Sequence, residues 1–132
     1  MHIRRTVIDA IVEHARRDSP LECCGLLIGS GEAVVASHEA GNLKASEVLY
    51  LVDPADHFAA IRSARAAGLS VVGAYHSHPA SAAVPSETDI RDANDPEFVH
   101  VIVSLAGATP QVAAYQIRDG AAIEVPIAIE RA

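Results

Sequence analysis

The stretch "SVVGAYHSHPASAAVPSETD", residues 70–89, holds the pattern that decides the fold. Its first half is an apolar, β-rich run bounded by Gly68 and Pro79, which predicts a strand over residues 70–78. Its second half is a loop of small residues that leads to Ser86, the expected N-cap of a short helix. Polar side chains that directly follow a buried strand are typical of a functional site on a loop.

Two helices are predicted upstream of this stretch. Apolar residues recur at helical spacing over residues 4–17, with Arg and Glu on the opposite face, and the run stops at Asp18-Ser19-Pro20. A second helix has Asp53 as its N-cap, Pro54 at its first position and Gly68 just past its end. The apolar stripe of the first helix predicts that it covers a sheet.

The remaining segments are predicted to be strands of one mixed sheet. They are residues 22–29 and 33–37, which form a hairpin, and residues 47–52, 98–105, 111–118 and 121–129. Asp119-Gly120 is a strong hairpin signal, and Pro126 places the last strand near an edge. The expected fold class is α/β (α+β), a mixed β-sheet flanked by helices, in a single domain over residues 1–132.

The charge of the chain narrows its classes of partner. The formal net charge is −7, whereas binding to a phosphate backbone requires clustered Lys and Arg. No apolar run approaches the roughly 18 residues of a membrane span. Charged residues within residues 1–17 also interrupt any signal-peptide core. We therefore expect neither a nucleic-acid partner nor a membrane partner.

The two cysteines, Cys23 and Cys24, are neighbours in the sequence. A bridge between them would be strained, so they do not form a disulfide framework. Side chains alternate along a strand, which sends the two thiols to opposite faces and predicts buried core residues. These features favour a reducing cytoplasm as the location of the protein.

His76, His78 and Asp89 are the candidate metal ligands. Side chains two residues apart on a strand project from the same face, so both imidazoles can reach one ion. A catalytic zinc site takes three protein ligands and leaves a fourth position for water, and Asp89 is the third candidate. Other interpretations remain open: the histidines could be ordinary exposed or hydrogen-bonded residues, and Ser86 with Asp89 could simply form a capping box.

A zinc hydrolase also needs a general base that takes a proton from the water. Glu22, Glu47 and Glu97 each lie at the mouth of an apolar strand, where partial burial raises the pKa of a carboxyl group toward the useful range. A glutamate in such a position is more often simply a solvated strand end. The residues alone do not choose among them.

The motif His76-Ser77-His78, seven residues, Ser86, two residues, Asp89 resembles that of the JAMM (MPN+) zinc metalloprotease family, minimal bacterial single-domain type. An upstream glutamate that opens a strand completes the family's pattern, and Glu22 occupies that position. The resemblance implies that His76, His78 and Asp89 ligate one zinc ion. It further implies that Glu22 is the general acid/base, that Ser86 hydrogen-bonds the oxyanion, and that the fold is the cytidine deaminase-like MPN domain.

The resemblance also implies a substrate class. Similar small bacterial domains are zinc peptidases that hydrolyse peptide or isopeptide bonds at the C-terminus of ubiquitin-like sulfur carrier proteins. The expected partner is therefore such a carrier with a Gly-Gly C-terminus, whose extended tail can pair with a strand edge. The chain lacks the inserted segments with which eukaryotic deubiquitinating members grip ubiquitin. Whether it forms a homodimer stays open.

Two other functions compete with a peptidase. A noncatalytic MPN-type scaffold would share the fold, but such members usually lack metal ligands. A cupin-like metal enzyme would use the His-x-His pair, but it would be nearly all β and would want a glutamate where Ala82 and Ala83 stand.

Four further side chains are expected to have structural positions. His14 and His57 lie on the predicted helices and are interpreted as surface or interface residues. His100, inside "FVHVIVSL", is interpreted as a core histidine whose hydrogen bonds are satisfied, and Tyr75 is expected to pack on the face opposite the candidate ligands.

Overall fold

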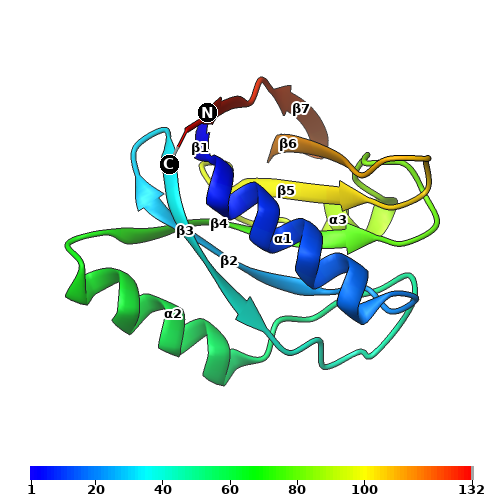
Figure 1. Ribbon diagram of the computed structural model, residues 1–132, viewed down its shortest axis with the longest axis horizontal. Helices are drawn as coiled ribbons and strands as arrows, with labels where there is room; N and C mark the ends of the chain where they lie inside the picture. Colours follow the sequence, from blue (N-terminus) through cyan, green and yellow to red (C-terminus); the bar gives the residue numbers. More distant parts are fainter. Residues whose placement is uncertain (132) are drawn as a thin grey trace.

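The computed structural model describes residues 1–131 and contains one curled, mixed sheet with three helices (Figure 1). The elements in chain order are β1 (His2–Arg4), α1 (Arg5–Asp18), β2 (Cys24–Ser30), β3 (Ala33–Ala40), α2 (Pro54–Ala66), β4 (Ser70–His78), α3 (Glu87–Asp92), β5 (Val99–Ser104), β6 (Gln111–Arg118), β7 (Ala121–Val125) and β8 (Ala128–Glu130). This arrangement confirms the predicted mixed sheet flanked by helices. No helix within residues 1–131 is long and apolar enough to cross a membrane.

The eight strands lie in the order β7-β6-β5-β4-β2-β3-β1-β8. β4 pairs antiparallel with β2 and parallel with β5, so it occupies the middle of the sheet. Six consecutive residues of β4, from Gly73 to His78, are accordingly buried. The central strand that the sequence predicted over residues 70–78 is confirmed, with both candidate histidines at its end.

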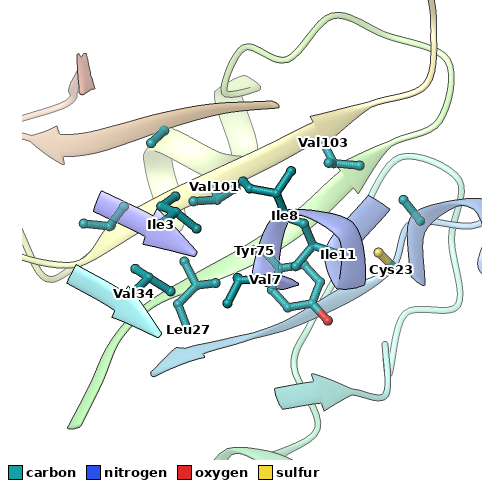
Figure 2. Packing of buried hydrophobic residues seen from close by; sticks show 13 residues of the cluster. Ile3, Val7, Ile8, Ile11, Cys23, Leu27, Val34, Tyr75, Val101 and Val103 are labelled. Carbon is teal, nitrogen blue, oxygen red and sulfur yellow. The ribbon is translucent and has the colours of Figure 1, made fainter. Parts of the chain in front are cut away.

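One face of the sheet is covered by α1, which crosses in front of the strands in Figure 1, and we call it the α1 face. Figure 2 shows the ring of Tyr75 among the side chains of Val7, Ile11 and Leu27, which belong to the largest cluster of buried apolar residues. The ring presses so closely on the backbone of β2 that a Cβ atom at Gly25 would collide with it. The α1 face is a dry core.

The opposite face is covered in part by α2, and we call it the α2 face. The helix begins as predicted, because the Asp53 carboxylate accepts a hydrogen bond of 2.9 Å from the Ala55 amide. Its buried residue Ala60 packs with Leu26 and Ala74 of the sheet. This contact holds α2 against β4 at Ala74. The polar side chains of His76 and His78 follow on the same face, toward the end of β4.

Two predictions about strands need correction, and one strand was missed. Residues 47–52 are not a strand: only Val52 forms an isolated bridge, to Asn42, and the Asn42 side chain instead bonds the backbone of Leu49 and Leu51. Such local side-chain bonds compete with a sheet ladder. The predicted strand over residues 121–129 is two strands, because the break at Pro126 sends β8 to pair with β1 at the far end of the sheet. β1 itself was not predicted.

Candidate metal centre

His76 and His78 lie at the end of β4 on the α2 face, and both are buried, with exposed fractions of 2% and 5%. Their Nε2 atoms are 3.1 Å apart and their ring centroids are 4.9 Å apart. The pairing of β4 with β2 and β5 fixes this geometry, since Cys24 and Ile102 flank His76 on the two neighbouring strands. The two imidazoles therefore point at one spot.

Asp89 reaches the same spot from the first turn of α3. Its Oδ2 atom lies 3.1 Å from Nε2 of His76 and 3.4 Å from Nε2 of His78. A capping box aims the carboxylate: Ser86 Oγ accepts from the Asp89 amide, and the Asp89 Oδ2 accepts from the Ser86 amide at 2.9 Å. The donor atoms of His76, His78 and Asp89 all lie within 4.8 Å of one another.

The hydrogen bonds around His78 leave its inner nitrogen ready for a cation. Nδ1 of His78 is 2.8 Å from the carbonyl oxygen of Ala82. A carbonyl only accepts, so Nδ1 carries the proton and Nε2 presents its lone pair to the cluster. An outer hydrogen bond of this kind orients metal-ligating histidines. Two imidazole nitrogens and a carboxylate oxygen match the donor set of a catalytic zinc site, so the residues fit that ion.

Electrostatics favours the protonation state that a cation needs in His76 and Asp89. For His78, burial would lower the pKa, but the contacts with Asp89 and the Ala82 carbonyl outweigh burial and raise it. Burial lowers the pKa of His76 and favours its neutral form. Burial alone would raise the pKa of the Asp89 carboxyl, but the contacts of the carboxylate with the His76 and His78 rings outweigh burial and hold that pKa well below its ordinary value. The Asp89 carboxylate is therefore ionised and the His76 imidazole neutral, as metal binding requires.

Glu22 lies just before β2 and is 5% exposed. Cys24 pairs with His76, and a further bond from the Ser77 amide to the Cys23 carbonyl continues this register, which places Glu22 beside His78 on the α2 face. Burial is the main reason that the pKa of Glu22 rises from 4.5 to about 7; the nearby His78 lowers it and Asp89 raises it. A carboxyl group with this pKa can both take and return a proton near neutrality.

The loop between β4 and α3 is tied to the sheet by two hydroxyl groups. Ser104 Oγ donates to the Ser81 carbonyl at 2.6 Å, and Tyr115 Oη donates to the Ala83 carbonyl at 2.6 Å. With the bond between His78 and Ala82, these contacts set the path by which the chain returns to the cluster. The sequence showed a turn-rich loop but gave no sign of which strands hold it.

Tyr50 is a neighbour of the cluster that the sequence did not reveal. Its ring stacks on His76 with centroids 4.3 Å apart and an interplanar angle of 19°. It arrives from the irregular segment that was predicted as a strand, which the Asn42 side chain holds through its bond to the Glu22 carbonyl. No motif marks Tyr50, because its position depends on a loop conformation.

Two of the four predicted positions of other side chains are wrong. His14 is not on the surface but 4% exposed, and its Nδ1 lies 2.7 Å from Tyr75 Oη. It continues the apolar spacing of Val7 and Ile11, which was the available signal. His100 is not satisfied, because among residues 1–131 its buried Nε2 has no hydrogen-bond partner.

The other positions are confirmed. His57 is exposed, and Tyr75 packs on the α1 face. Cys23 and Cys24 are free and buried, and they belong to separate clusters on the two faces of the sheet.

The comparison with protein families shows to which family this chain belongs. A family model for prokaryotic homologs of the JAB domain matches residues 4–118, a span that includes every residue of the cluster. The chain belongs to this family. Its membership confirms the resemblance that the His76 to Asp89 motif and Glu22 indicated.

Individual proteins are similar to this chain over most of its length. A desampylase of Haloferax volcanii is 41% identical over 106 residues, which covers 75% of this chain and 76% of that protein. A CysO-cysteine peptidase of Mycobacterium bovis is 36% identical over 128 residues, 95% of this chain and 88% of that protein. A solution structure of a Desulfitobacterium hafniense protein matches with a TM-score of 0.91 and 30% identity, covering 100% and 94% of the two chains.

Proposed function

We propose that this JAB-family chain is a zinc-dependent peptidase that hydrolyses the bond after the C-terminal Gly-Gly of a ubiquitin-like carrier protein. The observation that carries the proposal is the convergence of His76, His78 and Asp89, with donor atoms all within 4.8 Å of one another, beside a buried glutamate. Each of these residues stands where the family motif has its functional group.

His76, His78 and Asp89 would hold one zinc ion per chain. When bound, the ion supplies a Lewis acid that polarises the scissile carbonyl and lowers the pKa of a water in its open position to about 7. The three protein groups keep their aim because β4 and the capping box of α3 fix them. Tyr50, stacked on His76, limits the ways in which that ring can turn.

Glu22 would act as the general base and then as the general acid. Its pKa of about 7 means that at neutral pH a large fraction of the carboxyl groups is ionised and can accept a proton from the attacking water. The same carboxyl then returns the proton to the leaving amine. Its position beside His78 puts the departing group at that end of the cluster.

Ser86 would stabilise the negative charge that develops on the carbonyl oxygen. Its Oγ accepts a hydrogen bond of 3.1 Å from the Asp89 amide, so the hydroxyl hydrogen remains free to be donated to the substrate. A donor fixed in advance at such a place is worth roughly 100 to 1000-fold in rate. The capping box thus positions a ligand and an oxyanion donor together.

The proposed substrate class is supported by the names of the relatives and by the steric access that a glycine tail has to the metal centre. By their names, one relative is a desampylase, one is a CysO-cysteine peptidase and a third is a probable TtuB-protein conjugate cleaving protease. We take a ubiquitin-like protein with a Gly-Gly tail as the substrate class of this chain, because a glycine tail can approach a recessed metal without steric hindrance. Whether this chain cuts a linear peptide bond or an isopeptide bond depends on the carrier.

The two competing functions are less well supported. A noncatalytic scaffold needs none of the five motif residues, whereas all five are present here. A cupin-like enzyme would be nearly all β, whereas α1 and α2 cover the two faces of this sheet.

The test incubates the purified chain with small Gly-Gly-ending proteins of the host, each extended by one amino acid, with and without a chelator, and reads their masses. We expect one carrier to lose the added residue, and the chelator to prevent the loss. Glu22→Gln should keep stoichiometric zinc by atomic emission and lose about 100 to 10,000-fold in rate. Wild-type turnover by Glu22→Gln would refute the base assignment, and intact carriers after exposure to the zinc-loaded protein would refute the function.

A further inference from the structure

Glu22 lies just outside the sheet, and a loop holds its backbone there. β2 begins at Cys24, so the ladder between β2 and β4 does not include Glu22. Its amide instead donates a hydrogen bond of 2.8 Å to the Ser46 carbonyl, and its carbonyl accepts one of 3.1 Å from Nδ2 of Asn42. Both partners belong to residues 42–51, which we call the site loop and which lead from β3 toward α2 (Figure 1). The position of the proposed base therefore depends on this loop.

The side chain of Asn42 organises the site loop through four hydrogen bonds. Its Nδ2 donates to the carbonyls of Glu22, at 3.1 Å, and Leu49, at 3.0 Å. Its Oδ1 accepts from the amides of Lys44, at 3.0 Å, and Leu51, at 2.9 Å. An asparagine side chain has two N–H donors and one oxygen that accepts twice, so these bonds use its full capacity. Asn42 thereby ties the start and the end of the site loop to Glu22.

The backbone conformation of the site loop requires this support. Ala45 has a φ of 45°, in the left-handed region that residues with a Cβ atom disfavour. A residue stays in such a conformation only where the surrounding contacts enforce it. The Ala45 amide bonds the Asn42 carbonyl at 3.1 Å, and the Asn42 side chain holds the residue on the other side of it, Lys44. Removal of the Asn42 side chain should therefore release the loop.

The same loop places Tyr50 against the candidate metal centre. Tyr50 lies between two residues whose backbone groups bond the Asn42 side chain. Its ring stacks on that of His76, with centroids 4.3 Å apart. Asn42 thus sets the backbone positions of two residues that flank the metal ligands, Glu22 and Tyr50, although it is not one of the clustered ligands.

We infer that Asn42 is a positioning residue of the peptidase: its side chain holds Glu22 and the site loop in a fixed arrangement around the metal ligands. The inference rests on the proposed function, since it takes Glu22 as the general base. It adds a residue outside the motif, and it stands on the four hydrogen bonds of that residue. Because β4 and α3 fix the three ligands, loss of the Asn42 side chain should impair the reaction and not the binding of metal.

The first test compares the zinc-loaded full chain with its Asn42→Ala variant on a carrier fusion that ends in Gly-Gly plus one residue. A displacement of about 1 Å at a catalytic group can cost roughly 100-fold in rate, so we expect kcat to fall by about that factor. KM should change little, and one zinc ion per chain should be retained.

Asn94→Ala is the matched control and should keep the wild-type kcat, because Asn94 is exposed and is the only other asparagine of the chain. A wild-type kcat in Asn42→Ala, or a loss of its zinc, would overturn the inference and leave the peptidase intact. No cleavage by the wild type would instead refute the proposed function, and this inference with it.

A second measurement reports on the site loop without any peptidase reaction. Lys44 is exposed and is the only lysine of the chain, so a lysine-specific endoprotease can cut the folded protein only after this residue. In the metal-free protein we expect Asn42→Ala to be cut at least about tenfold faster than the wild type, because local opening of the loop becomes easier. Far-UV circular dichroism checks that the variant is folded. Equal rates of cutting would show that Asn42 does not hold the loop, and the inference would fail.

Asn42→Asp separates the two halves of the contact. A carboxylate can still accept from the amides of Lys44 and Leu51, but it cannot donate to the carbonyls of Glu22 and Leu49. We therefore expect the site loop of this variant to be cut more slowly than that of Asn42→Ala, whereas kcat is as low. If Asn42→Asp has the wild-type kcat, the bond to the Glu22 carbonyl does not position the base, and the inference is wrong.

Discussion

The two faces of β4 are built from alternate residues of one strand, yet one face is an apolar core and the other carries the candidate metal ligands. Tyr75 points into the α1 face, where apolar side chains from α1 close over it. His76 and His78 point into the α2 face, where a carboxylate and a neighbouring imidazole surround each ring. A shift of one residue in register would exchange core and site. The comparison teaches that one strand can contribute core packing with the residues of one face and functional groups with the residues of the other.

The largest effect expected from this separation is on the α2 face. His76→Ala removes a ligand from the cluster, so we expect loss of stoichiometric zinc and of all measurable peptidase activity. The α1 core does not contact this ring, so the far-UV circular dichroism should stay that of the wild type. Zinc by atomic emission and cleavage of a carrier fusion are the measurements. Retained zinc at one ion per chain would break the assignment of His76 as a ligand.

Ser86→Ala should weaken catalysis without removing metal. The substitution deletes the proposed oxyanion donor, which predicts a loss of roughly 100 to 1000-fold in kcat. It also deletes one half of the capping box, while Asp89 can still accept from the backbone amide of residue 86. Ser86→Thr, which restores the hydroxyl, is the control. An activity of Ser86→Ala close to that of the wild type would show that the serine acts only as a cap.

Glu22 belongs to the candidate site but also affects stability, because its carboxyl group is buried. Its titration should change the free energy of unfolding with pH. Its folded pKa of about 7 exceeds the ordinary value of 4.5, so the folded carboxyl keeps a proton that the unfolded one releases between these values. The contribution of Glu22 to stability is therefore fully present below about pH 4.5, falls as pH rises through 7, and is smaller by about 3 kcal/mol above pH 7. Urea unfolding of the metal-free protein at pH 5 and pH 8 measures this change.

Glu22→Gln provides the matched comparison, because a buried amide has no such titration. We expect the variant to lose most of this pH dependence and to be more stable than the wild type at pH 8, although it is inactive. The exposed Glu124, changed to Gln, is the control and should leave the wild-type dependence unaltered. If Glu22→Gln follows the same pH curve as the wild type, burial does not act on this carboxyl.

The smallest effect is expected on the α1 face and concerns stability alone. Tyr75→Phe removes the hydroxyl that bonds His14 Nδ1 at 2.7 Å and leaves a buried polar atom without that partner. This predicts a loss of about 2 kcal/mol in the free energy of unfolding. Although Tyr75 precedes His76 in the chain, kcat/KM per folded molecule should not change. A large fall in kcat/KM would mean that the two faces are coupled.

The sequence was informative wherever a structure depends on neighbours in the chain. α2 begins at the predicted cap Asp53, and the hairpin at Asp119-Gly120 has the positive φ angles that its residues favour. It failed at residues 47–52, where apolar β-formers are exposed and the side chain of Asn42 replaces the ladder. The pairing of β8 with β1 joins the two ends of the chain, which no local pattern encodes.

The candidate site was predictable to the same extent and for the same reason. The spacing of His76, His78 and Asp89 nominated the cluster, and the structure brings their donor atoms together. The residues alone did not separate Glu22 from the other two glutamates; that choice came from the family motif, and its burial beside His78 now gives it a physical basis. Tyr50 could not be found, since its place depends on an irregular loop.

The capping box also bears on the order in which the molecule assembles. Ser86 and Asp89 bond across a single turn, a contact that a short loop can close early, whereas His76 and His78 come into line only after β4 has found β2 and β5. An ion that requires all three groups can be captured only by a chain whose central strands β2, β4 and β5 have already paired. Metal uptake during refolding would then follow the pairing of these strands, and it could be timed as such.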